Sequence, residues 1–361
     1  VQFNGETGPL VTAGLQIASR TDDVMTGDIA VSAIDALAAL EGVVRIEGAR
    51  LMHPMLDIAT ADAHLGNTRS PGIGTPPTAY RGRNVIVGLI DSGIDYTHAS
   101  FRRADGSTRI LRIWDQFLVP AAGEAAPAGY SYGVEYTDTQ INSALGNANP
   151  HSVVRHRDRG AHGTHVAGIA AGNGRAAGTF AGVAPESDII MVRNDSRGSD
   201  GTLQLANSVR TVDALHYIYS VAAALNRPVV VNQSQSMNVG PHDGTTLLEQ
   251  AINRELGFPG RAYVCSSGNQ ADNAIAVSGS VPASGNLVQT FSVPAGDVVD
   301  DTIDLWYPGN QRLSVTLTNP AGVATPVVVP PASAAAPTTL VHTLADGNVV
   351  AIDSRIDSVQ N

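Results

Sequence analysis

The chain has 361 residues, of which 43% are hydrophobic, and a formal net charge of −11 at pH 7. A chain of this length can bury a large core and has room for about two or three domains. The acidic balance argues against a nucleic-acid partner, because non-specific binding needs clustered positive charge. No apolar run approaches the roughly 18 residues of a membrane span, so no membrane partner is expected. The single cysteine, Cys265, excludes an internal disulfide framework.

Residues 1–50 alternate short β-like runs with one predicted helix over 31–42, and a strand follows over 43–50. This pattern predicts a small α+β domain with an open sheet and a helix on one face. Residues 51–79 are rich in Pro, Gly, Ser and Thr and are predicted to form an extended linker.

Residues 80–276 alternate apolar, β-branched runs with helical segments. Such an alternation predicts an α/β fold, with a parallel sheet covered by helices on both faces. The predicted strands are 85–90, 188–193, 229–232 and 262–267, and the predicted helices begin at His162 or cover 203–225 and 245–256. The segment from Phe101 to Arg159 interrupts this alternation and is expected to form a surface excursion beside the functional cleft, with a tolerated loop insertion as the alternative.

Residues 277–361 read differently, because helical patterns stop. Short β runs alternate in polarity and are separated by Gly, Pro and Asn. We predict an antiparallel β-sandwich, or part of one.

Three motifs in a fixed order carry chemistry. An apolar strand ends in Asp91-Ser92-Gly93, a His-Gly-Thr-His sequence starting at His162 opens a helix of small residues, and Ser-Gly-Asn ends at Asn269 after a further strand. The order and content resemble the subtilases, serine peptidases whose triad runs Asp, His, Ser along the chain. Their serine segment, Gly-Thr-Ser-Met-Ala or close to it, is expected after Asn269, and nothing like it occurs before Asn361.

The resemblance implies a role for each matched residue. Asp91 corresponds to the carboxylate that orients the histidine, and His162 to the general base, so the two side chains are expected within hydrogen-bonding reach. Asn269 corresponds to the side-chain donor of the oxyanion hole. The implied function is a serine endopeptidase acting on peptides or proteins. Its serine is expected downstream of Asn361, so this chain alone is expected to be inactive.

The resemblance also implies how the other segments act. Ser234, Gln235 and Ser236 correspond to the strand whose backbone pairs with substrate. Residues 1–50 resemble a propeptide that assists folding and inhibits the enzyme by docking on the two surface helices over 203–225 and 245–256, although a small α+β domain of no special role is the alternative. Residues 277–361 resemble a jelly-roll insert, which is expected to be partial in this chain. A secreted or extracytoplasmic location is favoured by the family.

Metal and thiol chemistry are weaker interpretations of the same residues. A metal cluster is one alternative for the histidine region, but the His-Glu-x-x-His pattern of zinc hydrolases is absent. Four aspartates near residue 300 suit calcium, but without a known loop spacing solvated turn carboxylates are favoured, so no metal or cofactor is expected. Cys265 lies on a predicted strand, where a buried thiol is expected. The residues concerned are His156, Asp158, His162 and His165, and Asp297, Asp300, Asp301 and Asp304.

Two other classes of function remain open from the sequence. One is a non-catalytic pseudoprotease or binding module that keeps the fold without the serine. The other is a processed chain that pairs with a separate serine-bearing chain. The reading frame after Asn361 distinguishes them from the enzyme.

Overall fold

The computed structural model describes residues 1–21, 24–46, 80–178, 180–194, 196–197, 203–204, 208–235, 238, 240–269, 275–293, 301–308, 310–331 and 338–355. The predicted linker over 51–79 lies outside these residues. The chain divides into two compact units, Val1–Met55 and Leu56–Asn361. Each unit has its own core.

The first unit is an α+β domain with a four-stranded antiparallel sheet in the order β2-β3-β1-β4. The predicted helix over 31–42 is shorter than expected, because a 3₁₀ turn precedes it and the helix ends at Ala38. A second helix that the sequence pattern missed follows β1. Phe3, Leu10, Leu15, Met25 and Leu37 form the core. The elements are β1 (Gln2–Phe3), α1 (Gly8–Thr12), β2 (Gln16–Thr21), β3 (Val24–Asp28), η1 (Val31–Ala33), α2 (Ile34–Ala38) and β4 (Val43–Arg45).

The second unit contains a six-stranded sheet in the order β12-β11-β5-β8-β6-β7. All neighbours pair in parallel except β6 and β7, which are antiparallel. This is the α/β architecture predicted from the alternation of apolar runs and helices. Its strands are β5 (Ile86–Asp91), β6 (Ile110–Asp115), β7 (Val134–Thr137), β8 (Asp188–Arg193), β11 (Val229–Gln233) and β12 (Arg261–Cys265).

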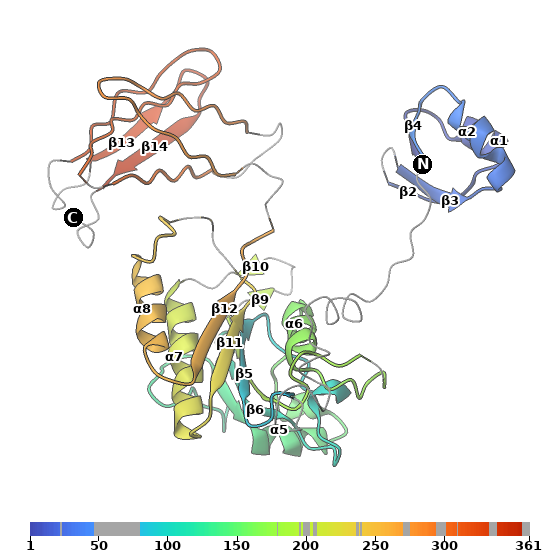
Figure 1. The fold of residues 1–361 in the computed structure, drawn as a ribbon, viewed down its shortest axis with the longest axis vertical. Helices are drawn as coiled ribbons and strands as arrows, with labels where there is room; N and C mark the ends of the chain where they lie inside the picture. Colours follow the sequence, from blue (N-terminus) through green and yellow to red (C-terminus); the bar gives the residue numbers. More distant parts are fainter. Residues whose placement is uncertain are drawn as a thin grey trace. The chain divides into compact units, whose positions relative to one another are not determined.

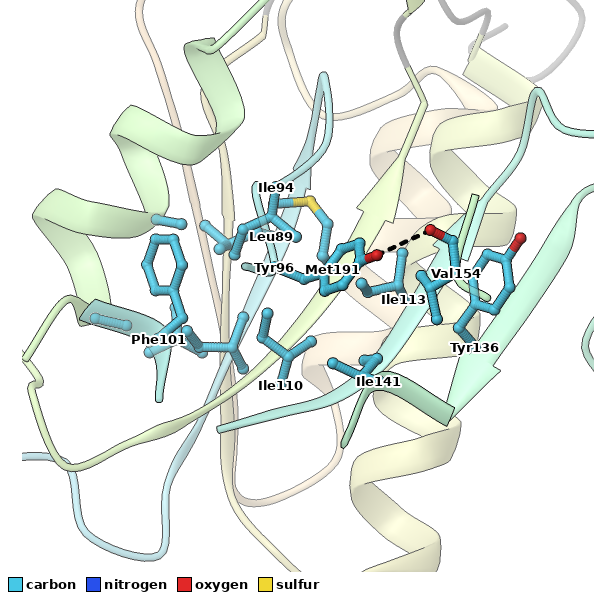
Figure 2. Close-up of a cluster of buried hydrophobic side chains, with 14 of the residues drawn as sticks. Leu89, Ile94, Tyr96, Phe101, Ile110, Ile113, Tyr136, Ile141, Val154 and Met191 are labelled. Atoms are coloured by element: carbon cyan, nitrogen blue, oxygen red, sulfur yellow. Dashed lines mark hydrogen bonds between the residues drawn. The ribbon is translucent and has the colours of Figure 1, made fainter. Parts of the chain in front are cut away.

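Helices cover both faces of this sheet, and Figure 1 shows α7 and α8 on one side with α6 on the other. One core contains apolar residues of α5 and α6 with Leu89 and Met191 of the sheet (Figure 2), where the Tyr96 hydroxyl donates to the Val154 carbonyl at 3.0 Å. The other core lies under α7 and α8. The helices are α5 (Asp138–Leu145), α6 (His162–Ala171), α7 (Ser208–Ala224) and α8 (Leu247–Leu256), and short 3₁₀ turns are η2 (Ala99–Phe101) and η3 (Pro150–Ser152).

The expectation that Phe101 to Arg159 forms a surface excursion is wrong. The segment contributes β6, β7 and α5 to the main sheet and its core. Ile113 of β6 enters one core and Trp114 enters the other, and neither side chain is exposed. An apolar run that is buried on both faces makes an inner strand, and the loops around it conceal that pattern in the sequence.

The predicted helix over 203–225 is also shorter than expected. It begins at Ser208, and Leu203–Gln204 instead forms β10, which pairs antiparallel with β9 (Ser196–Arg197). α8 starts at Leu247, close to the predicted start at Thr245, because Thr246 and Glu249 form a capping box.

After residue 277 the described residues form antiparallel pairs, in part as predicted. Isolated bridges join Val315 to Val328 and Thr318 to Ala324. A hairpin follows, made of β13 (Thr338–Thr343) and β14 (Val349–Ser354), whose side chains alternate between half-buried and exposed. A complete β-sandwich remains a prediction.

Candidate active site

Asp91 and His162 lie in contact at the carboxyl edge of the sheet. Asp91 is the last residue of β5, and His162 is the first residue of α6. The Oδ1 atom of Asp91 lies 2.7 Å from Nδ1 of His162, so the expected proximity is observed. Because a carboxylate only accepts hydrogen bonds, Nδ1 of His162 is the donor, and in the neutral form of the ring Nε2 carries the free lone pair. The Asp91 side chain is 1% exposed and the imidazole is 58% exposed, so the histidine faces outward from a fixed carboxylate.

The start of α6 is held by residues outside the helix. Its N-cap residue, Ala161, has a left-handed backbone with φ of 57° and no side chain that can cap. Asp158 takes the capping role, because its Oδ2 accepts from the backbone N–H of Thr164 at 2.8 Å and from its hydroxyl at 2.6 Å. The other oxygen accepts from the Ser92 hydroxyl at 2.8 Å, and Ser92 Oγ accepts from the Gly163 N–H at 2.9 Å. Ser92 and Asp158 therefore join the turn after Asp91 to the first turn of the helix.

Asp158 is ionised in this position. Burial would raise the pKa of its carboxyl, but hydrogen bonds from Thr164 and Ser92 outweigh burial and lower the pKa below its ordinary value. A negative charge at a helix N-terminus is also favoured by the helix dipole. The motif comparison did not identify this role, although an aspartate four residues before His162 is a local signal for it.

Gly163 allows the helix to approach the strand closely. A Cβ at this position would lie 2.2 Å from the carbonyl oxygen of Gly93, so only glycine fits without moving one segment. The glycine directly after His162 thus has a physical cause, which is the short separation between α6 and the Asp91 turn.

The predicted substrate-binding residues follow β11 directly. β11 pairs with β5 on one side and with β12 on the other as far as Gln233. Backbone groups available to another strand therefore begin only after Gln233, where Ser234 and Gln235 are half-buried. Ser236 lies outside the described residues.

Asn269 follows β12 and is exposed at the same carboxyl edge of the sheet. This position alone does not test the predicted role of Asn269 as a donor in the oxyanion hole. Cys265 contradicts the expectation of a buried thiol, because it is exposed at the end of an edge strand.

The residues of the alternative metal cluster belong to separate networks. His156 is buried against Asp115, Asp158 caps α6, and His165 is exposed. Within the described part of the chain, no group of three His, Cys, Asp or Glu side chains is placed to hold a metal ion. Asp297 and Asp300 of the suggested calcium site lie outside that part. Asp304 accepts hydrogen bonds from Gly240 and Trp306.

One sheet face beside α6 is exposed. Val87 and Leu89 of β5 enter the core under α6, and their register partners on β11, Val230 and Asn232, share that face. The same face continues onto β12 through Ala262 and Val264. Val230 is 38% exposed and Val264 is 53% exposed, whereas the opposite face of both strands is covered by α7 and α8. An apolar strip thus lies open next to the helix that carries His162.

The fold and the pair define the class: an α/β protein with a histidine–carboxylate dyad at the carboxyl edge of a mostly parallel sheet. The profile of the Subtilase family matches residues 82–338, and the chain therefore belongs to the subtilase family. No helix among the residues described above is long and apolar enough to cross a membrane.

Individual relatives agree with this assignment. The chain is similar in structure to the CspB protease of Clostridium perfringens, with a TM-score of 0.58 and 26% identity, over 81% of this chain and 61% of that one. It is 31% identical to the subtilisin-like protease SBT3 of Solanum lycopersicum, over 48% of this chain and 24% of the relative. It is 28% identical to a thermophilic serine proteinase of Bacillus sp. strain AK1, over 52% of this chain and 33% of the relative. The matched region is thus a third or less of the length of these two curated relatives.

Proposed function

We propose that the protein is a serine endopeptidase in which Asp91 and His162 activate a serine hydroxyl for attack on a peptide carbonyl. The observation that carries the proposal is the 2.7 Å hydrogen bond between Nδ1 of His162 and the buried Asp91 carboxylate. Because this bond occupies Nδ1, Nε2 is the atom that accepts the serine proton and later delivers it to the leaving amine. Asp91 stabilises the imidazolium that forms between these two steps.

The serine comes from a segment that is not among these 361 residues, expected downstream of Asn361. The open strip formed by Val230, Ala262 and Val264 supports this proposal, because exposed valines on a sheet face are suited to packing against a helix. A helix on this strip would lie beside α6. Its first residue would then approach the carboxyl edge of the sheet, where the His162 imidazole is exposed.

Asn269 is proposed to donate to the oxyanion that forms on the attacked carbonyl. A donor of this kind contributes about 10²–10³-fold in turnover, a magnitude established with subtilisin itself. Ser234, Gln235 and Ser236 are proposed to pair with the substrate backbone by strand addition. The proposal is supported by the pairing of β11, which ends at Gln233, so that the backbone groups after Gln233 are available to a peptide.

Residues 1–50 are proposed to act as an inhibitory propeptide, and residues 277–361 as part of an inserted β domain. The first unit has its own core, which suits a segment that folds and acts separately. A secreted location is proposed as well, since one relative of 29% identity is a minor extracellular protease of Bacillus subtilis. Residues 1–55 made separately should inhibit peptide hydrolysis by the complete enzyme. Absence of inhibition at high micromolar concentration would make this unit an ordinary appended domain.

The central test compares the 361-residue chain with the protein extended through its reading frame. The extended protein should hydrolyse a broad peptide substrate, and the 361-residue chain should not. His162→Ala and Asp91→Asn should each lower kcat by about 10⁴-fold or more. The first change removes the general base, and the second removes the carboxylate that holds the imidazole in the Nδ1–H tautomer. His342→Ala, in the β13 hairpin, is the matched control and should leave kcat unchanged. Absence of a downstream serine, or activity that survives His162→Ala, would contradict the proposal and favour a pseudoprotease or a chain completed by a partner.

A further inference from the structure

A second histidine–carboxylate pair lies beside the Asp91 turn and is completely buried. Nδ1 of His156 lies 2.8 Å from Oδ2 of Asp115, and both side chains are 0% exposed. Asp115 ends β6 at the same sheet edge at which Asp91 ends β5, with β8 between them. As in the pair of His162 and Asp91, an imidazole Nδ1 contacts a carboxylate oxygen, but here neither side chain is exposed to solvent.

The hydrogen bonds define the protonation of the buried pair. Asp115 also accepts from the Arg193 guanidinium at 3.1 Å and from the Phe117 N–H at 3.1 Å. Burial would raise the pKa of Asp115, but the His156 hydrogen bond and the nearby Arg193 charge hold it below its ordinary value. Asp115 is thus a carboxylate, and Nδ1 of His156 carries a proton.

The other nitrogen of His156 is an acceptor. Nε2 accepts from the backbone N–H of Ile94 at 3.1 Å, which an imidazolium cannot do because both of its nitrogens are donors. His156 is therefore a neutral imidazole in a single tautomer. A buried N–H that lost this acceptor would carry the cost of an unsatisfied donor.

The imidazole of His156 supports the turn that follows Asp91. Ile94 follows Ser92 and Gly93 in the segment after Asp91, and Gly93 has a positive φ of 124°. A Cβ on Gly93 would lie 2.9 Å from Cε1 of His156, so the ring is in close contact with the turn backbone. The Ser92–Asp158 bond holds the turn from the helix side, and His156 holds it from the β6 side.

We infer that His156 is a positioning residue: its neutral imidazole, oriented by Asp115, fixes the Ile94 N–H and thereby aims the Asp91 carboxylate at His162. The inference rests on the proposed function only in that Asp91 orients the general base. Two histidine–aspartate pairs are thus linked, and the buried pair of His156 and Asp115 sets the geometry of the pair of His162 and Asp91. Neither the motifs nor the family match assigns this role to His156.

The first test needs no catalytic serine. In the 361-residue chain labelled with ¹⁵N-histidine, the His162 Nδ1–H should give a low-field proton signal, and His156 should show the neutral Nδ1–H tautomer at neutral pH. His156→Phe should weaken or shift the His162 signal, whereas His156→Gln, whose amide can accept from Ile94 and donate to Asp115, should largely restore it. His151→Phe is the control, since His151 contacts Tyr96 and makes no bond to the turn from Asp91 to Ile94.

Asp115→Asn provides a second variant in case His156→Phe does not fold. It should weaken the hydrogen bond from Nδ1 of His156, because an amide oxygen carries no full charge, and with it the His162 signal. A folded His156→Phe chain with an unchanged His162 signal would overturn the inference, and so would a cationic His156 in the unmodified chain at neutral pH. If the extended protein is an active peptidase, His156→Phe should lower kcat by about 10²-fold with little change in KM. Inactivity of the extended protein would defeat the proposed function and leave the spectroscopic result intact.

Discussion

Replacing Asp158 with alanine should destabilise the second unit and release the first turn of α6. The carboxylate accepts from the Thr164 N–H, the Thr164 hydroxyl and the Ser92 hydroxyl at 2.6–2.8 Å. Loss of a helix cap costs about 1 kcal/mol. Loss of the charged hydrogen bond to the buried Ser92 hydroxyl costs about 1.5–3 kcal/mol. The expected decrease in the free energy of unfolding is therefore about 2.5–4 kcal/mol.

Asp158→Asn is the matched variant. Its amide oxygen can still cap Thr164, and its NH₂ group can donate to the Ser92 hydroxyl, which accepts as readily as it donates. We expect a decrease of about 1 kcal/mol for this variant. Urea unfolding followed by Trp114 fluorescence measures both, in a Trp306→Phe background, because Trp114 is fully buried in the sheet and Trp306 is exposed. A loss below about 1 kcal/mol for Asp158→Ala, or equal losses for both variants, would refute the capping argument.

Three further outcomes are expected from the same measurements. Gly163→Ala should separate α6 from the Asp91 turn and abolish the low-field His162 signal. Gly168→Ala, where an added Cβ meets nothing within 4 Å, should leave that signal unchanged and raise the free energy of unfolding by up to about 1 kcal/mol. Equal effects of the two variants on the signal would argue against the close approach. Arg109→Met should lower the free energy of unfolding by about 2–4 kcal/mol, because the buried guanidinium donates to the carbonyls of Ser187 at 2.9 Å and Ala171 at 2.6 Å. A decrease of less than about 1 kcal/mol would contradict this. The folded pKa of Asp158 is depressed, so the stability that its carboxylate contributes is complete above the ordinary pKa of 3.8 and is lost as the pH falls through the folded pKa. The difference in free energy of unfolding between the unmodified chain and Asp158→Ala should therefore shrink only below about pH 4. A constant difference down to about pH 2 would contradict this.

The parallel sheet and its strand ends were predictable because local patterns determine them. The run before Asp91 is apolar at every position, as expected for a strand buried on both faces. A helix that leads into a strand of a parallel sheet begins at the carboxyl edge of that sheet, so the proximity of Asp91, at a strand end, and His162, at a helix start, followed from the motif order once the fold class was assigned. The start of α8 was predictable for a local reason too, since its capping box lies within four residues.

Tertiary structure alone decided the rest, because the partners are distant in sequence. The segment around Trp114 looked like an excursion, and only the sheet shows that both of its faces are buried. The cap of α6 comes from Asp158 and Ser92, not from the residue before the helix, since Ala161 has no polar side chain to offer. The neutral state of His156 depends on an N–H 62 positions away in sequence and on a carboxylate 41 positions away. Sequence patterns record what neighbours do within a turn or a strand, whereas hydrogen bonds across elements exist only once the chain has folded.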